Sequence, residues 1–353
     1  MERSNIFELA LSDWMKGNSP ESDVVISTRI RLARNLQNEP FPILATNAQS
    51  KEVLDQVVNV LNEHHLERVS KLDLYILDEM SELQKRVLVE KHLISPSLAS
   101  ESRNGAVMIS DNESVSIMVN EEDHLRIQCL SPGFQIREAW EIANKIDDIF
   151  EQHIDYAFDE RRGFMTSCPT NVGTGIRASV MMHLPALVLT QQMTRILQAI
   201  NQVGLAVRGI YGEGSEAIGN VFQVSNQITL GQSEEEIIDN LHSVAKQIIE
   251  HERAARQKLL AESKLRISDR VSRSYGILSH AAIMDSKEAA QRLSDVRLGV
   301  DLGLLPNVST HILNELMVMT QPGFLQQFAG TKLSADDRDV RRAQLIREKI
   351  GAS

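Results

Sequence analysis

The stretch that indicates the fold is residues 106–130, AVMISDNESVSIMVNEEDHLRIQCL. Residues 106–109 and 115–119 are short apolar runs separated by polar turn formers, a pattern typical of a β-hairpin. A third run, 125–130, alternates apolar and polar residues as a half-buried strand does. Consecutive strands joined by short turns are antiparallel, so this stretch predicts an antiparallel sheet and not repeated βαβ units.

Helical patterns lie on both sides of this stretch. Apolar residues recur at helical spacing in three segments: 48–65, 136–153 and 187–203. Three more short strands are predicted: 72–77, 205–209 and 220–230. The mixture of hairpins and helices predicts an α+β fold, an antiparallel sheet flanked by helices.

The character of the chain changes near residue 233. The segment 233–236, Ser-Glu-Glu-Glu, is a capping-box pattern that begins a long helix. Beyond about residue 260 the chain is predicted to be all-helical, with four expected interruptions: Gly276, Gly303, Pro306 and Pro322-Gly323.

Charge divides the chain at nearly the same place. Of its 353 residues, the first 250 carry 21 basic and 36 acidic side chains, whereas residues 251–353 carry 16 basic and 12 acidic ones. Such a break is a sign of separate domain surfaces. We therefore expect an α+β domain over 1–254 and an all-helical C-terminal domain over 255–353.

Composition excludes several classes of protein. A net charge of −11 argues against a protein that coats nucleic acid. No apolar run is long enough to span a membrane, and no secretory signal is visible, so we expect a cytoplasmic protein. Two cysteines are too few for a disulfide framework or a zinc site, and no metal site made of protein side chains is predicted.

Two arginines alternate in the segment 27–34, Ser-Thr-Arg-Ile-Arg-Leu-Ala-Arg. In a strand, Ser27, Arg29 and Arg31 share one face, and planar guanidinium groups two residues apart can bind adjacent phosphates. A solvated sheet face is the alternative, and this segment alone favours that alternative.

Three carboxylates precede the strand at 125–130. Strand parity places Glu122, His124, Arg126 and Gln128 on one face, which is typical of a site that binds both a cation and an anion. A charged turn before a strand explains the same residues, and the two interpretations are equally supported.

Two loops rich in glycine carry further arginines. The segment 168–177, Cys-Pro-Thr-Asn-Val-Gly-Thr-Gly-Ile-Arg, permits close backbone approach, and 208–216 pairs an arginine with a carboxylate. Alone, each segment is weak evidence for a site, because turn geometry explains the glycines and an inert buried thiol is the usual form of a lone cysteine such as Cys168. No phosphate-binding loop of the Walker A type is present.

Together and in this order, the four segments resemble the phosphagen (guanidino) kinase family. That family carries Ser-Thr-Arg-x-Arg, Asn-Glu-Glu-Asp-His-Leu-Arg, Cys-Pro-Thr-Asn-x-Gly-Thr and Arg-Gly-x-x-Gly-Glu, all present within about residues 23–231. The resemblance implies catalytic roles for Glu122, Glu213 and Cys168. It also implies nucleotide contacts by Ser27, Thr28, Arg29, Ile30, Arg31, His92, Arg126, Arg177, Ala178, Ser179, Val180, Met181, Arg208, Gly209, Ile210, Tyr211, Gly212 and Glu213.

Two features resemble the bacterial protein-arginine kinases of the McsB type within that family. The N-terminal helical domain of the small-molecule enzymes is not seen before residue 27, and a helical C-terminal domain is added. That domain contains Arg-Asp-x-x-Arg-Ala at 338–343, which by resemblance implies a phosphoarginine-binding site formed by Arg338, Asp339, Arg342 and Ala343. The alternative for this motif is a charged helix start.

The resemblance implies an ATP-dependent kinase, with Mg²⁺, that phosphorylates arginine side chains in proteins. It further implies a stress-gene repressor and unfolded proteins as substrates, a zinc-binding activator protein, a Clp-type protease that degrades the marked proteins, and a homodimer. Two alternatives stay open: a small-molecule guanidino kinase acting on free arginine, and a non-catalytic module that senses nucleotide.

Overall fold

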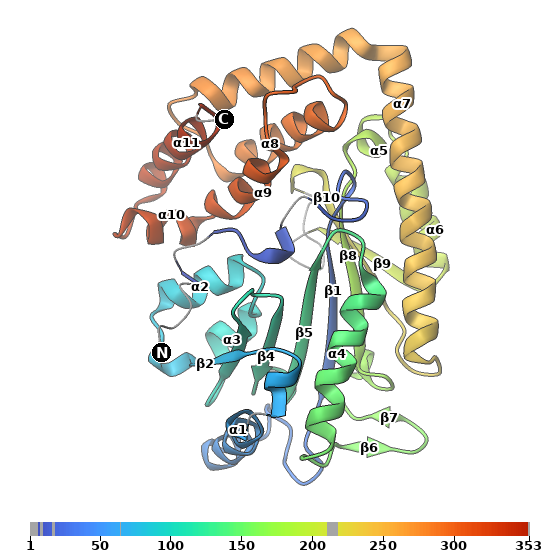
Figure 1. Ribbon diagram of the computed structural model, residues 1–353, viewed down its shortest axis with the longest axis vertical. Coiled ribbons are helices and arrows are strands. Elements are labelled where there is room, and N and C mark those ends of the chain that lie inside the picture. The colour runs from blue at the N-terminus through green and yellow to red at the C-terminus, as the bar shows by residue number, and fades with distance from the viewer. Residues whose placement is uncertain (1–5, 8–9, 16–17, 64, 210–217, 352–353) are drawn as a thin grey trace.

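A computed structural model describes residues 6–7, 10–15, 18–63, 65–209 and 218–351. At its centre is one eight-stranded sheet with strand order β2-β3-β4-β5-β1-β8-β10-β9 (Figure 1). Strand β1 (Val25–Arg34) pairs with β5 on one side and β8 on the other, and every pair in the sheet is antiparallel. The predicted antiparallel sheet is therefore confirmed.

Six of the other strands of this sheet lie at or near predicted strands, whereas β8 is not predicted from the sequence pattern. Their bounds are β2 Leu72–Ile76, β3 Ala106–Ser110, β4 Val115–Val119, β5 Leu125–Pro132, β8 Ile176–His183, β9 Leu205–Gly209 and β10 Val221–Asn226. A separate small hairpin consists of β6 (Phe158–Asp159) and β7 (Gly163–Phe164). Strand β10 is shorter than the 220–230 predicted, because the side chain of Asn226 bonds the backbone of Ile176, Ala178 and Ile228 at the end of the strand.

One face of the sheet is covered by helices. They are α1 (Asn47–Asn62), α4 (Ile136–Glu151), α5 (Pro185–Leu189), α6 (Met193–Gln202) and the first part of α7 (Glu234–His280). The single helix predicted over 187–203 is wrong. Gln191 lies at φ 59°, a left-handed conformation that separates α5 from α6.

The opposite face carries α2 (Glu82–Glu90), α3 (Pro96–Glu101) and some of the residues of the C-terminal helices. The C-terminal helices that follow α7 are α8 (Ser286–Asp301), α9 (Thr310–Met319), α10 (Pro322–Ala329) and α11 (Ala335–Gly351). They confirm the prediction of an all-helical C-terminal region. Gly303 and Pro306 separate α8 from α9, and Pro322 opens α10. Gly276, however, lies within α7, since one glycine costs a helix only about 1 kcal/mol.

Helix α7 connects the two halves of the molecule. It bends at Ser263, where φ is −142°, and after the bend it turns across α8 and α11 (Figure 1). The expected boundary at residue 254 lies within this helix, shortly before the bend. A shared apolar cluster joins the halves, because Trp14 and Leu130 pack in the same core as Phe324 and Leu345.

None of the helices within the described residues is both long enough and apolar enough to cross a membrane.

Candidate active site

Five arginines from four strands line one cleft on the sheet face opposite α4. Arg29 and Arg31 lie on β1, Arg126 on β5, Arg177 on β8 and Arg208 on β9. The antiparallel register explains their convergence: Arg31 is directly opposite Arg177, and Arg208 is opposite Gln223. The cleft has a cavity volume of about 320 Å³.

The arginines of the floor are half-buried and repel one another. Burial lowers the pKa of Arg29 to about 10, with a further contribution from Arg126 and Arg177. Burial likewise lowers the pKa of Arg31 well below its ordinary value, helped by Arg29, Arg126 and Arg177. Such crowding of cations is stabilised by a polyanion, so the cleft has the electrostatics of a nucleotide phosphate site.

Hydrogen bonding supports the same conclusion. Arg29 Nη2 donates to Gln223 Oε1 at 2.8 Å. Within the described part of the chain, however, the buried Nε of Arg31 has no hydrogen-bond partner. A buried donor without an acceptor is costly, so Arg31 fits an external ligand rich in acceptor oxygens.

The acidic side of the cleft is organised by Arg126. Its Nη1 donates to Glu121 Oε1 at 3.0 Å and its Nη2 to Glu122 Oε2 at 2.9 Å. The Glu121 side chain is only 3% exposed and also accepts from Ser95 Oγ at 2.6 Å, whereas the Glu122 side chain is 41% exposed. Glu122 is thus the carboxylate that a solvent-borne cation can reach.

Asp123 ties this acidic segment to the loop of Cys168. It is fully buried and accepts from Asn35 Nδ2 at 2.6 Å and from the Ser167 backbone N at 2.7 Å. Cys168 lines the cleft, with its Sγ 3.0 Å from Thr170 Oγ1. Sequence reasoning did not single out Asp123, although its place inside the Asn-Glu-Glu-Asp-His motif is the signal that could have done so.

The prediction that His124 shares the face of Arg126 is wrong. Strand β5 begins only at Leu125, so the alternation of side chains does not extend to His124. Its ring leaves the cleft: Nδ1 accepts from the Leu36 backbone N at 3.0 Å, and Nε2 lies 3.0 Å from Pro40 O. Gln128 does line the cleft and donates to His92 O at 2.8 Å.

His92 lies at the inner end of the cleft. Its φ is 59°, and its ring packs edge-on against Trp14 with centroids 5.8 Å apart. Burial, with a contribution from Arg29, lowers its pKa to about 4. His92 is therefore neutral at pH 7 and offers the cleft a polar group without charge.

Side chains alternate between the two sheet faces along β1 and β8, so only some of the remaining residues expected to contact the nucleotide lie near the cleft. Ile30, Ala178 and Val180 point into the core beneath the sheet, and Thr28 Oγ1 donates to Gly133 O. Ser27, Ser179 and Met181 line a smaller cavity beside the cleft, and Gly209 lines the cleft itself. Ile210, Tyr211, Gly212 and Glu213 lie outside the described residues.

The C-terminal motif, residues 338–343, lies in the first half of α11. Arg338 is partly exposed, and Asp339 accepts from Arg342 through its carboxylate. Arg342 is only 2% exposed and donates to Thr320 O and Met284 O, while Ala343 lies in the core of the C-terminal helices. Arg338 and Asp339 are thus accessible to solvent, whereas Arg342 and Ala343 are buried.

Comparison with known protein families divides the chain at the bend of α7. Residues 52–255 match the family model for the C-terminal catalytic domain of ATP:guanido phosphotransferases. Residues 264–353 match the C-terminal domain of the protein-arginine kinase McsB.

Curated relatives match over nearly the full length. The chain is 63% identical over 350 residues to the protein-arginine kinase of Brevibacillus brevis, covering 99% of this chain and 98% of that protein. It is 64% identical to the protein-arginine kinase of Halalkalibacterium halodurans, covering 97% and 96%, and 57% identical to that of Bacillus subtilis, covering 99% and 96%.

Solved structures share the fold at low identity. A lombricine kinase superposes with a TM-score of 0.58 at 24% identity, covering 71% of each chain. A Schistosoma mansoni taurocyamine kinase with bound transition-state analogue components gives 0.59 at 21% identity, covering 82% of this chain and 43% of that one. The family matches, the full-length relatives and the arginine cleft all agree. The chain therefore belongs to the phosphagen kinase (ATP:guanido phosphotransferase) family, in its protein-arginine kinase branch, and it is an ATP-dependent phosphotransferase.

Proposed function

We propose that this chain transfers the γ-phosphoryl group of ATP to arginine side chains in proteins. The observation that carries the proposal is the cleft itself, where five arginines converge and Glu122 stands exposed at the edge. Arginines suit the triphosphate, and an exposed carboxylate suits a cationic acceptor that arrives on another protein.

On the nucleotide side, the reaction needs alignment and neutralisation of charge more than covalent help. Arg29, Arg31, Arg126, Arg177 and Arg208 would hold the phosphates and offset the charge that develops during transfer. Among the described residues no cluster of three or more acidic, His or Cys side chains could hold a metal ion. Mg²⁺ would therefore be bound mainly by the phosphates of the nucleotide, and it would supply further neutralisation of their charge.

On the acceptor side, the obstacle is a guanidinium that is protonated at neutral pH and so is a poor nucleophile. Glu122 would orient one terminal nitrogen and accept its proton as the N–P bond forms and the P–O bond to ADP breaks. Because Glu122 pairs with Arg126, the incoming guanidinium competes with Arg126 for the same carboxylate. Glu213 is proposed as the second carboxylate and Cys168 as a further contact to the guanidinium.

The test is to incubate the chain with Mg-ATP and an arginine-rich protein and to map phosphate by methods that preserve N–P bonds. We expect acid-labile phosphate on arginine side chains. Phosphorylation of free arginine with none on protein would overturn the proposal in favour of a small-molecule kinase. ATP binding without transfer to either acceptor would favour a nucleotide-sensing module.

We propose Arg338 and Asp339 as the accessible part of a phosphoarginine site that regulates the enzyme. The guanidinium of Arg338 would bind the phosphoryl group and the carboxylate of Asp339 the guanidinium portion. The variant Arg338→Ala with Asp339→Ala should lose the activity response to added phosphoarginine, each variant being compared with its own basal rate. Arg273→Ala, an exposed arginine elsewhere in the C-terminal half, is the control, and an unchanged response in the double variant would contradict this assignment.

The wider setting is proposed on the same resemblance. Marked proteins would pass to a Clp-type protease, a stress-gene repressor would be inactivated by phosphorylation, and a zinc-binding protein would activate the enzyme. We also propose a cytoplasmic homodimer. Sedimentation of the full chain tests the dimer, and degradation assays with phosphorylated and unphosphorylated substrate test the link to proteolysis.

A further inference from the structure

An apolar loop, residues 40–44 (Pro-Phe-Pro-Ile-Leu), lies between β1 and α1 at the lower end of the sheet in Figure 1. Ile43 and Leu44 are 79% and 76% exposed, and among the described residues only Leu265 is a more exposed large hydrophobic residue. The other three residues of the loop are partly exposed. Runs of several exposed apolar residues are uncommon on a protein surface unless they form a contact with another molecule.

The apolar loop has a defined conformation. Leu44 N donates to Phe41 O at 2.8 Å, and Ala45 N donates to the same oxygen at 3.0 Å. Arg103 Nη1 donates to Ala45 O at 2.7 Å, which holds the C-terminal end of the loop, and the two prolines fix their own φ angles. Because the loop is already ordered, little conformational entropy is lost when it binds another chain.

The apolar loop is attached to the turn that carries Glu122. His124 Nδ1 accepts from the Leu36 backbone N, so its Nε2 carries the proton and donates to Pro40 O at 3.0 Å. Glu122 is two residues before His124. Ile43 is three residues after Pro40, so the Cα atoms of Ile43 and Glu122 are at most about 25 Å apart.

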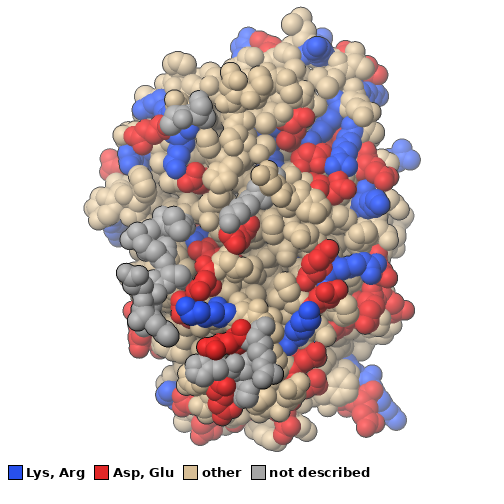
Figure 2. All heavy atoms as spheres, viewed as in Figure 1, with Lys and Arg blue, Asp and Glu red and all other residues tan. Residues whose placement is uncertain are grey.

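The surface around the apolar loop is acidic. Residues 36–63 include four acidic residues and one basic residue, Lys51, which pairs with Asp55. Figure 2 shows the same excess of acidic over basic side chains at this lower end of the molecule. An acidic surface attracts a basic polypeptide and repels a second copy of a chain whose net charge is −11.

The size of the apolar loop also limits what can occupy it. Its two exposed and three partly exposed side chains offer much less area than the roughly 800 Å² per partner that a stable protein–protein interface buries. Such an area suits a short-lived contact. A substrate protein, which must leave after each transfer, makes a contact of this kind, whereas a permanent subunit does not.

We propose that the apolar loop is a docking site for an extended segment of the substrate protein. A large apolar side chain of the segment packs on Ile43 and Leu44, and the target arginine reaches Glu122. This inference rests on the proposed function and specifies its substrate class. An extended chain covers about 25 Å with about seven residues, so the apolar residue lies within about seven residues of the arginine. Because large apolar residues are mostly buried in folded proteins, the site selects unfolded segments.

The test compares two peptides that each contain a single arginine. One peptide has leucine five residues before and five residues after the arginine, and the other has serine at both positions. With Mg-ATP and the full chain, we expect kcat/KM for phosphoryl transfer to be about tenfold higher for the leucine peptide, since docking buries part of a leucine side chain. The gain should come from a lower KM with an unchanged kcat, because docking does not change between substrate and transition state.

The double variant Ile43→Ser with Leu44→Ser tests the loop directly. The preference for the leucine peptide should fall below about twofold, while kcat/KM for the serine peptide stays unchanged. Both side chains are more than three-quarters exposed, so the variant keeps its fold. Leu265→Ser, which removes a leucine that is 83% exposed on α7, is the matched control and should keep the full preference.

Two outcomes would overturn the docking site and leave the proposed function in place. They are equal kcat/KM for the two peptides with the wild-type chain, and a leucine preference that survives in the double variant. A double variant that sediments differently from the wild type would identify the loop as a contact between copies of the chain and would also overturn the proposal. Absence of transfer to either peptide would contradict the proposed function itself, and this inference with it.

Discussion

Two arginines, Arg31, which is half-buried in the cleft, and Arg342, which is buried in the C-terminal helices, show how one residue type can serve opposite purposes. Arg342 donates to the backbone oxygens of Thr320 and Met284 and pairs with Asp339. Arg31 lies among other arginines, and its Nε finds no acceptor within the described chain. Removing a buried arginine whose hydrogen bonds are all satisfied leaves its partners unpaired, whereas an arginine with an unpaired donor marks a place for a ligand.

The largest effect is expected when the exposed carboxylate beside the cleft arginines is removed. Glu122→Ala should lower the rate of phosphoryl transfer by roughly 10²–10⁴, since it removes the proposed proton acceptor. Folding and ATP binding should change little, because the Glu122 side chain is 41% exposed. Glu141→Ala, on the exposed side of α4, is the control, and substantial residual activity in Glu122→Ala would remove Glu122 from this role.

Substitution of Arg31 tests the unsaturated member directly. Arg31→Met should raise the KM for ATP by roughly 10- to 100-fold, because charge-assisted bonds to phosphate are lost. When no nucleotide is bound, the substitution should not lower the free energy of unfolding. The reason is that desolvation and the neighbouring arginines already disfavour the charged form of Arg31 in the folded chain. Kinetics and urea denaturation of the same variant measure both effects. A clear loss of stability would show that Arg31 supports the fold as Arg342 does.

Substitution of Arg342 should give the opposite result in the same stability measurement. Arg342→Met leaves the carbonyls of Thr320 and Met284 without their donors and should lower the free energy of unfolding by about 2–4 kcal/mol. Arg273→Met, whose side chain is 75% exposed, is the control and should change the free energy of unfolding by less than about 0.5 kcal/mol. Equal effects of the two substitutions would contradict the contrast.

The smallest expected effect concerns pH. The folded pKa of His92 is about 4 against an ordinary 6.5, so the unfolded chain binds the extra proton and stability falls as pH drops through this window. Asn tolerates a positive φ, so His92→Asn can keep the backbone conformation. Between pH 6.5 and 4 the variant should lose less stability than the wild type, by up to about 1.4 kcal/mol for each pH unit. The difference between variant and wild type, measured at pH 7 and pH 5, isolates His92 from His124 and His183, which are present in both. Parallel pH profiles would exclude this contribution.

Much of the fold could be predicted from periodicity alone. The hairpin of β3 and β4, the helices α1 and α4, and the capped start of α7 follow directly from local patterns. The break between α5 and α6 could not be predicted, because Gln191 is not a residue type that signals a left-handed conformation. The uninterrupted passage of α7 through Gly276 was missed because context outweighs a single weak helix former.

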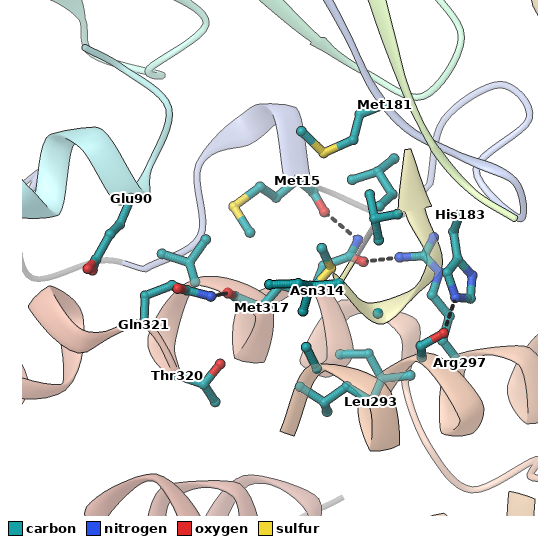
Figure 3. Close-up of a pocket in the computed structure, with 18 of the residues that line it drawn as sticks. Met15, Glu90, Met181, His183, Leu293, Arg297, Asn314, Met317, Thr320 and Gln321 are labelled. Carbon is teal, nitrogen blue, oxygen red and sulfur yellow. Dashed lines mark hydrogen bonds between the residues drawn. The ribbon is translucent and has the colours of Figure 1, made fainter. Parts of the chain in front are cut away.

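The candidate site was predictable only in part. Alternation correctly grouped Arg29 with Arg31, and the sheet register, which no local pattern reveals, brought Arg177 and Arg208 to the same cleft. His124 was misplaced because alternation was extended beyond the start of β5. The cavity that lies between the sheet and helices α8 and α9 (Figure 3) could not have been predicted, because the segments that line it are far apart in the sequence and meet only through tertiary packing.

The packing of the N-terminal turn against α9 has a consequence for the order in which the molecule can fold. Asn314 Nδ2 donates to Met15 O at 2.7 Å, and Trp14 belongs to the same core as Val318 and Phe324. During synthesis this turn leaves the ribosome well before α9 and α10, which pack against it. The sheet residues Ile26 and Leu130 can cover one side of the turn early, but its other side stays uncovered until α9 is made, and only then is the turn fully buried.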